Sequence, residues 1–187
     1  MVWIVLGVVV LLVLYVVLTY NGLVRLRNRV EAAWAQIDVQ LKRRYDLIPN
    51  LVETVKGYAS HERQTLEAVT AARTASMNAQ GPAQQAQAEN MLSGALKSLF
   101  AVAEAYPELK ANQNFLQLQD QLSGIEGELQ GARRYYNATV RDLNSTIQSF
   151  PPTLIARPMG FTEEPFYQDD DPTIQSAPKI SFPRPAA

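Results

Sequence analysis

The hydrophobic pattern divides the chain into an apolar start and a longer part with helical periodicity. Residues 1–20 contain no charged side chain and are mostly Val, Leu, Ile, Trp and Gly. A helix that spans a membrane needs about 20 largely apolar residues, so this run predicts a single transmembrane anchor. A secretory signal peptide would need a basic start, a shorter apolar core and a small-x-small cleavage site, and none is present. We therefore expect the anchor to stay uncleaved. Only Gly22 opposes its continuation into the next helix.

Beyond the anchor, apolar residues recur every three or four positions, which is typical of amphipathic helices. The pattern predicts helices at about 23–45, 47–78, 84–106 and 113–150. Such helices bury their apolar faces together when short turns join them, so we expect an all-α, antiparallel up-down four-helix bundle over residues 21–150. An intermolecular coiled coil is the alternative for the last helix, but the apolar faces of the other three favour the bundle. That helix carries a heptad repeat of Phe115, Leu122, Leu129, Tyr136, Leu143 and Phe150.

Proline and asparagine positions predict where the helices begin and end. Proline removes a backbone donor from a helix interior but is tolerated in a first turn. Pro49 therefore predicts the start of a new helix, with Asp46 as its cap. This interpretation places a tight reversal near Tyr45 and Asp46, and a kinked continuous helix is the alternative. Asn112 or Asn114 is the expected cap of the last helix.

Proline also marks the end of the domain, because eight of the 11 prolines lie at or beyond Pro151. Residues 151–187 thus form a Pro-rich tail, which we expect to be disordered from about residue 168. Apolar side chains between Leu154 and Tyr167 predict a segment that lies either along the bundle or at the membrane surface.

Composition narrows the classes of function. The chain has 17 Lys and Arg against 18 Asp and Glu, and this balance argues against a nucleic-acid-binding protein. It has no Cys, which excludes thiol catalysis and iron–sulfur clusters, and a single His. His61 has no histidine partner for a metal site, so we interpret it as a solvent-facing residue inside a helix. We assign no catalytic, cofactor-binding or metal-binding residue, expect no cofactor, and predict that the protein is not an enzyme.

Basic residues follow the anchor directly, at Arg25, Arg27 and Arg29. The positive-inside rule then places the N-terminus outside and the bundle in the cytoplasm. Two further basic clusters, residues 42–44 and 133–134, are interpreted as solvated faces, as salt bridges to Glu31 or Asp46, or as contacts to anionic lipid.

Glycines recur every three or four residues in the last predicted helix, at Gly124, Gly127 and Gly131. No Lys-Ser/Thr pair follows them, so they do not form a phosphate-binding loop. Small residues at this spacing favour close helix approach, either within the domain or between copies in a homo-oligomer.

Three sequence blocks carry a family resemblance. The first runs from Tyr20 to Val52 and contains EAAWAQIDVQLKRRYDLIPNLV; the others are YPELKAN at 106–112 and ARRYYN at 132–137 with Phe150-Pro151. Together they resemble the LemA family over about residues 1–167. The resemblance implies a four-helix bundle on one membrane helix, in the bacterial inner (cytoplasmic) membrane, with no established enzymatic activity. It also implies work with other membrane proteins, such as a membrane zinc peptidase or TPM-domain proteins, and it supplies no catalytic residues.

These patterns predict a single-pass membrane protein whose bundle is an interaction or scaffold module. A membrane-attached, ligand-sensing bundle is a second hypothesis, which requires a polar pocket between helices. A carboxylate-dependent hydrolase is a third, and the absence of paired acids at matched spacing argues against it.

Overall fold

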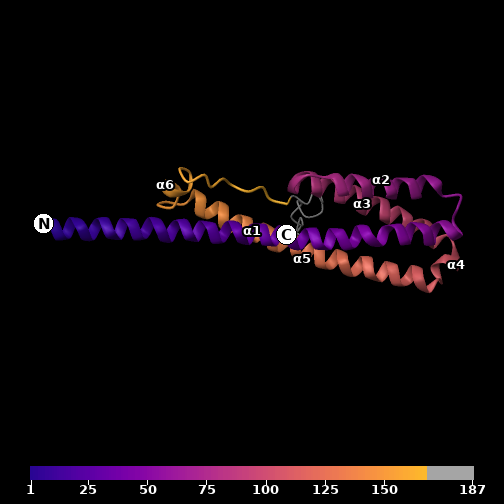
Figure 1. Cartoon of the computed structure of the whole chain (residues 1–187). Helices are drawn as coiled ribbons and strands as arrows, with labels where there is room; N and C mark the ends of the chain where they lie inside the picture. Colours follow the sequence, from indigo (N-terminus) through magenta and orange to yellow (C-terminus); the bar gives the residue numbers. More distant parts are fainter. Residues whose placement is uncertain (168–187) are drawn as a thin grey trace, which may run out of the picture.

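The structure is a computed structural model that describes residues 1–167, and within that range the chain is helical without strands (Figure 1). The all-α prediction is therefore confirmed, while the predicted disorder from residue 168 lies outside the described residues. The elements are α1 (Val2–Tyr58), α2 (Arg63–Asn78), α3 (Gly81–Glu104), α4 (Pro107–Lys110), α5 (Gln113–Gln148) and α6 (Thr153–Ala156).

Helix α1 runs unbroken from the apolar start into the domain. Residues 1–18 are exposed, whereas Leu23 is fully buried. The apolar part reaches a mean hydropathy of 3.0 with none of that stretch buried, so it is long and apolar enough to cross a membrane. The expected continuation of the apolar run into the first domain helix is confirmed.

The longer helices run alternately in opposite directions (Figure 1). α1 packs along α5, α2 packs along α3, and all four contribute buried side chains to one core. The heptad positions from Phe115 to Leu143 are buried there. Phe150 is 78% exposed because α5 ends at Gln148, so the last predicted heptad position is wrong. Of the two expected caps of this helix, Asn112 is the one observed, because its Oδ1 accepts a hydrogen bond from the backbone N–H of Phe115 at 3.0 Å.

The predicted reversal near Tyr45 and Asp46 is wrong. α1 continues through Pro49 to Tyr58, and the chain reverses at residues 59–62. Pro49 lacks the N–H that would bind the carbonyl of Tyr45 one turn earlier. Arg73 Nε of α2 donates to that carbonyl at 2.8 Å and replaces the missing backbone donor. The continuous helix, the alternative interpretation, is the one observed.

The glycines of α5 do not bring helices of the described chain together. A Cβ at Gly124 or Gly127 would meet no atom within 4 Å, and one at Gly131 would meet only Arg134 Nη2 at 4.0 Å. The prediction that these glycines allow close packing of helices within the domain is therefore wrong for the described residues. Close packing of helices between two copies of the chain stays a prediction.

After α5 the chain turns through α6 and returns along α1 and α5 (Figure 1). Phe161 packs edge-on against Tyr20, with 5.7 Å between the ring centroids. Residues 161–167, which we call the strap, end with Tyr167 beside Trp34 of α1 at 6.3 Å between ring centroids. The segment that the sequence placed along the bundle or at the membrane surface thus begins beside the end of the apolar run and continues along the domain.

Candidate functional site

His61, the one histidine of the chain, lies in the turn between α1 and α2 and is exposed. Its solvent-facing interpretation is confirmed, and its placement inside a helix is wrong. Residues 1–167 contain no group of three His, Asp or Glu side chains arranged to hold a metal ion. The features with a potential function in this range are a buried polar cluster, the strap and the outer face of α5.

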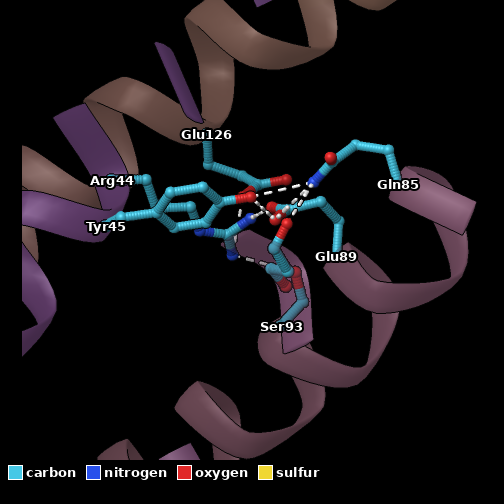
Figure 2. Close-up of polar contacts among 7 residues, drawn as sticks. Arg44, Tyr45, Gln85, Glu89, Ser93 and Glu126 are labelled. Atoms are coloured by element: carbon cyan, nitrogen blue, oxygen red, sulfur yellow. Dashed lines mark hydrogen bonds and ion pairs between the residues drawn. The ribbon is translucent and has the colours of Figure 1, made fainter. Parts of the chain in front are cut away.

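The buried polar cluster joins α1 to α3 (Figure 2). Arg44 Nη1 donates to Glu89 Oε2 at 2.7 Å, and the Tyr45 hydroxyl donates to Glu89 Oε1 at 2.6 Å. Gln85 Nε2 donates in turn to the Tyr45 hydroxyl oxygen at 2.8 Å. Arg44 is 4% exposed and Glu89 only 1%. Both oxygens of the buried carboxylate therefore accept short hydrogen bonds, which offsets the loss of hydration.

The cluster opens toward solvent on the side of α5. Arg44 Nη2 donates to Ser93 Oγ at 2.9 Å and lies 3.1 Å from Glu126 Oε2 (Figure 2). The Glu126 side chain is 34% exposed. A groove of about 590 Å³ lies over these groups, between α3 and α5. Its lining also includes Leu96, Lys97, Phe100, Gln119, Ser123 and Gln130. This groove lies between helices and is lined by both polar and apolar side chains, and the ligand-sensing hypothesis requires a site in such a position.

The two neighbouring arginines of α1 have opposite surroundings. Arg43 pairs with Glu128 at 2.8 Å on the surface, where the side chains are 55% and 54% exposed. The predicted solvated face therefore holds for Arg43 and is wrong for Arg44, and the salt-bridge partners are Glu128 and Glu89 instead of the predicted Glu31 or Asp46. The missed signal is helical spacing, since Arg44 lies three residues after Leu41 and four before Ile48, on the apolar stripe.

Tyr45 serves this cluster as a fixed hydrogen-bond donor. Burial raises the pKa of its phenol, and the hydrogen bond to Glu89 and the negative charge of that residue raise it further. All three effects favour the neutral phenol, which keeps the proton that it donates. The phenol is therefore a structural donor at neutral pH and not a proton-transfer group.

Two asparagines of α5 hold the strap. Asn144 Oδ1 accepts from the backbone N–H of Glu164 at 2.9 Å, and its Nδ2 donates to the carbonyl of the same residue at 2.8 Å. Asn137 makes the same pair of bonds to Tyr167, at 2.8 and 3.0 Å. Seven helical residues rise about 10.5 Å, and three extended residues span about 10 Å. The two spacings match, so one helix face binds an extended segment at two points.

Aromatic contacts fix the same segment. The Tyr136 hydroxyl donates to the carbonyl of Pro165 at 2.9 Å, and its ring packs edge-on against Trp34 at 5.3 Å between centroids. Arg133 lies over the ring of Tyr167, 4.7 Å from its centroid. Burial, with a smaller contribution from Glu164, raises the pKa of Tyr136 to about 12. Arg133 is thus a buried cation–π partner, and its assignment to a solvated basic face is wrong.

The outer face of α5 carries Gly124, Gly127 and Gly131, which we call the glycine face. Gly124 and Gly131 line grooves between α5 and α1, and Gly127 lines the groove between α5 and α3. Among the described residues no side chain from another helix covers these three positions. Backbone is accessible here over two turns of an otherwise regular helix.

Comparison with known proteins places these features within a shared region. The model of the LemA family matches residues 33–182. The chain is 28% identical over 152 residues to Protein LemA of Metamycoplasma hominis, covering 79% of this chain and 68% of that protein. It is 25% identical over 187 residues to the magnetosome proteins MamQ 1 and MamQ 2 of Paramagnetospirillum magneticum, covering 86% of this chain and 69% of each. The buried cluster, the strap and the glycine face all lie inside the family match.

Proposed function

Because the chain belongs to the LemA family, we propose that it is a single-pass membrane protein whose helical domain is an interaction module. The exposed apolar part of α1 supports the anchor, since its length suits a bilayer. Arg25, Arg27 and Arg29 favour a cytoplasmic domain at the bacterial inner membrane. Helices α1, α2, α3 and α5 would then act as a four-helix bundle held close to the lipid.

The observation that carries the interaction role is the glycine face of α5. A glycine in a helix interior is destabilising by about 0.5–1 kcal/mol relative to alanine. Gly124, Gly127 and Gly131 bring this cost without being packed against the described part of the chain. Small residues allow a second helix to approach the backbone closely, and flanking grooves accept its side chains.

We propose that a helix of another membrane protein lies on this face. The family resemblance suggests a membrane zinc peptidase or a TPM-domain protein as that partner. A second copy of this chain is the competing occupant. Another membrane protein is the proposed occupant because the anchor would hold the domain next to the membrane, where membrane proteins are its neighbours.

Site-specific photo-crosslinking in intact membranes tests the proposal. A photoreactive residue replaces Gln130, which lines the groove on α5, or Gln64, an exposed position of α2 that serves as the control. We expect Gln130 to yield an adduct with another membrane protein and Gln64 to yield none. Equal products at both positions, no product, or an adduct of two copies of this chain would contradict the proposed partner.

A second variant separates contact from folding. Gly127→Leu places a side chain into open space, so the fold is retained. The same variant fills the proposed contact and removes the Gln130 adduct. An unchanged adduct in a folded Gly127→Leu protein would disprove a partner helix on this face.

The side of the membrane is tested by cysteine labelling, because the chain contains no Cys. A cysteine in place of Gln64 should resist a membrane-impermeant reagent in intact cells and react after the cells are opened. Reaction in intact cells would place the domain outside.

The groove above Arg44 favours a second candidate, the ligand-sensing bundle. Lys97 lines this groove and would pair with an anionic metabolite, whereas Arg44 is already paired with Glu89 and Glu126. A metabolite that raises the melting temperature of the full chain, but not of Lys97→Gln, would support this function. We propose no enzymatic activity for the cluster, because the Tyr45 phenol keeps its proton and both oxygens of the buried Glu89 carboxylate already accept hydrogen bonds.

A further inference from the structure

Large apolar side chains are exposed around α6, outside the apolar part of α1. Phe150 is 78% exposed, Leu154 65% and Met159 54%. They lie within ten residues of one another, whereas the neighbouring Ile155 and Ala156 are buried against the domain. The exposed residues are therefore carried on a fixed turn, and exposed apolar groups gathered in this way mark an interaction surface.

This turn is placed at the end of the apolar run. α6 packs on both α1 and α5, and Figure 1 shows it beside α1 at the domain end nearest the N-terminus. Phe161, just after the turn, contacts Tyr20. Val16 is 37% exposed but Leu18 is 66% exposed, so one face of the last apolar turns is already partly covered. The turn that carries Phe150, Leu154 and Met159 thus lies level with the point where α1 would leave the hydrocarbon core.

Arginines are concentrated at this end of the domain, although Glu31, Glu163 and Glu164 border it. Residues 1–30 and 145–162 contain four arginines and no Asp or Glu. Arg27 pairs with Glu31 at 3.2 Å, and the other three are exposed. Apolar side chains beside exposed cations are typical of segments that insert at the boundary between lipid headgroups and acyl chains. The three exposed arginines at this end of the domain are Arg25, Arg29 and Arg157.

We propose that Phe150, Leu154 and Met159 form a membrane foot that inserts into the bilayer spanned by α1, with the exposed arginines over anionic lipid phosphates. This inference rests on the anchor in the proposed function. The lipid surface is the occupant because the foot is continuous with the apolar run and has the complementary charge. A single helix leaves a domain free to rotate about it, and the foot adds a second attachment that fixes which face of α5 points along the membrane.

Single-cysteine fluorescence tests the foot in the full chain, which has no native Cys. An environment-sensitive fluorophore is attached at Leu154 or Met159. Leu12 within the apolar run is the positive control, and Leu116, 44% exposed near the opposite end of α5, is the negative control. Leu116 and Leu154 are separated by most of the length of α5, about 50 Å for a helix of this size.

The labelled protein is reconstituted in phosphatidylcholine and phosphatidylglycerol vesicles that contain a phosphatidylcholine with a nitroxide, placed near the headgroup for the foot positions and in the middle of the acyl chain for Leu12. We expect quenching at Leu154 and Met159 to be at least about twofold that at Leu116, because only the foot enters the interface. Omitting phosphatidylglycerol, or combining the Leu154 label with Arg157→Gln, should reduce quenching at Leu154 and leave Leu12 unchanged.

The controls distinguish the two ideas. Quenching at Leu12 with none at Leu154 and Met159 would overturn the foot and leave the anchor intact. Absence of quenching at Leu12 would overturn the anchor and, with it, the foot. A blue shift at Leu154 that depends on protein density and not on the nitroxide would show that a second copy covers the surface, which also overturns the foot. Quenching at Leu154 that ignores phosphatidylglycerol would overturn the role of the arginines.

Discussion

Arg43 and Arg44 allow the effect of burial on an ion pair to be isolated. They are adjacent in sequence and bind glutamates at nearly equal distances, 2.8 Å to Glu128 and 2.7 Å to Glu89. The Arg43 pair is about half exposed, whereas the Arg44 pair is buried. The matched perturbations are Glu89→Gln and Glu128→Gln, which keep side-chain size and remove one negative charge each.

The expected magnitudes follow from the contacts. Glu89 accepts from Arg44 and Tyr45, and hydrogen bonds to charged groups contribute about 1.5–3 kcal/mol each. Breaking a buried pair costs about 3–5 kcal/mol, since an uncompensated charge remains. Glu126, 3.1 Å from Arg44, retains part of the pairing, so we expect about 3 kcal/mol for Glu89→Gln. An exposed pair contributes about 0–1 kcal/mol, which is the expectation for Glu128→Gln.

Thermal unfolding of the full chain in mild detergent, followed by far-ultraviolet circular dichroism, measures both variants. A loss of about 3 kcal/mol lowers the Tm by about 6–12 °C in a protein of this size. Glu128→Gln should lower the Tm by less than about 4 °C. Equal shifts for the two variants would refute the argument that burial decides the contribution.

A double variant checks the physical cause. Replacing a buried pair with apolar residues of similar size is often neutral, because no charge remains unpaired. Arg44→Met combined with Glu89→Leu should therefore be more stable than Glu89→Leu alone, with a coupling of at least about 1 kcal/mol. A double variant less stable than the single one would show that an unpaired Arg44 is not the source of the loss.

Three further predictions concern Pro49, α5 and the strap. Arg73→Ala should lower the free energy of unfolding by about 1–2 kcal/mol, because the Tyr45 carbonyl loses its donor. The loss should be clearly smaller in a Pro49→Ala background, which restores a backbone N–H to that carbonyl. Equal losses of unfolding free energy in denaturant titrations of the two backgrounds would contradict this. Gly127→Ala should stabilise the domain by about 0.5–1 kcal/mol, because alanine favours a helix interior more than glycine does. Gly81→Ala should destabilise the domain, because Gly81 has a φ of +75°. Shifts of Tm with the same sign for the two variants would refute this difference. The pKa of Tyr136 is raised to about 12, and an unperturbed tyrosine ionises near about pH 10, so the folded state holds this proton more tightly. The stability that protonated Tyr136 adds to the folded state is complete below about pH 10 and is lost as the pH rises toward about 12. Tyr136→Phe should therefore make the fall in unfolding free energy between about pH 9 and about pH 12 less steep. An unchanged slope would count against a raised pKa of Tyr136.

The helical pattern was predictable from sequence wherever burial alone determines it. The heptad from Phe115 to Leu143 and the cap at Asn112 follow from local periodicity and local hydrogen bonding. The course of α1 through Pro49 could not be predicted from local sequence, because it depends on Arg73, which lies 24 residues away in another helix. A local rule assigns proline to a helix start, and a tertiary contact to the freed carbonyl overrides that rule.

The candidate sites were less predictable because their residues meet only after folding. Arg44 and Arg133 occupy apolar-stripe positions, and a charge at such a position signals a buried partner, although sequence alone does not name Glu89 or Tyr167. Asn137 and Asn144 lie two helical turns apart, yet their function as a clamp requires the returning strap. The bare glycines were visible as a pattern, but only coordinates show that the described chain does not pack against them.

The unbroken course of α1 also determines how far the domain extends from the end of the apolar run. Rising about 1.5 Å per residue, the helix places Tyr58 no more than about 57 Å beyond Tyr20. With the apolar end held in a bilayer, the turn at residues 59–62 and the start of α5 occupy the most distant level, and α6 the nearest. A partner that has only short loops outside the lipid would therefore reach the α6 end alone. Contact with the opposite end would require a protein that itself extends tens of ångströms from the membrane.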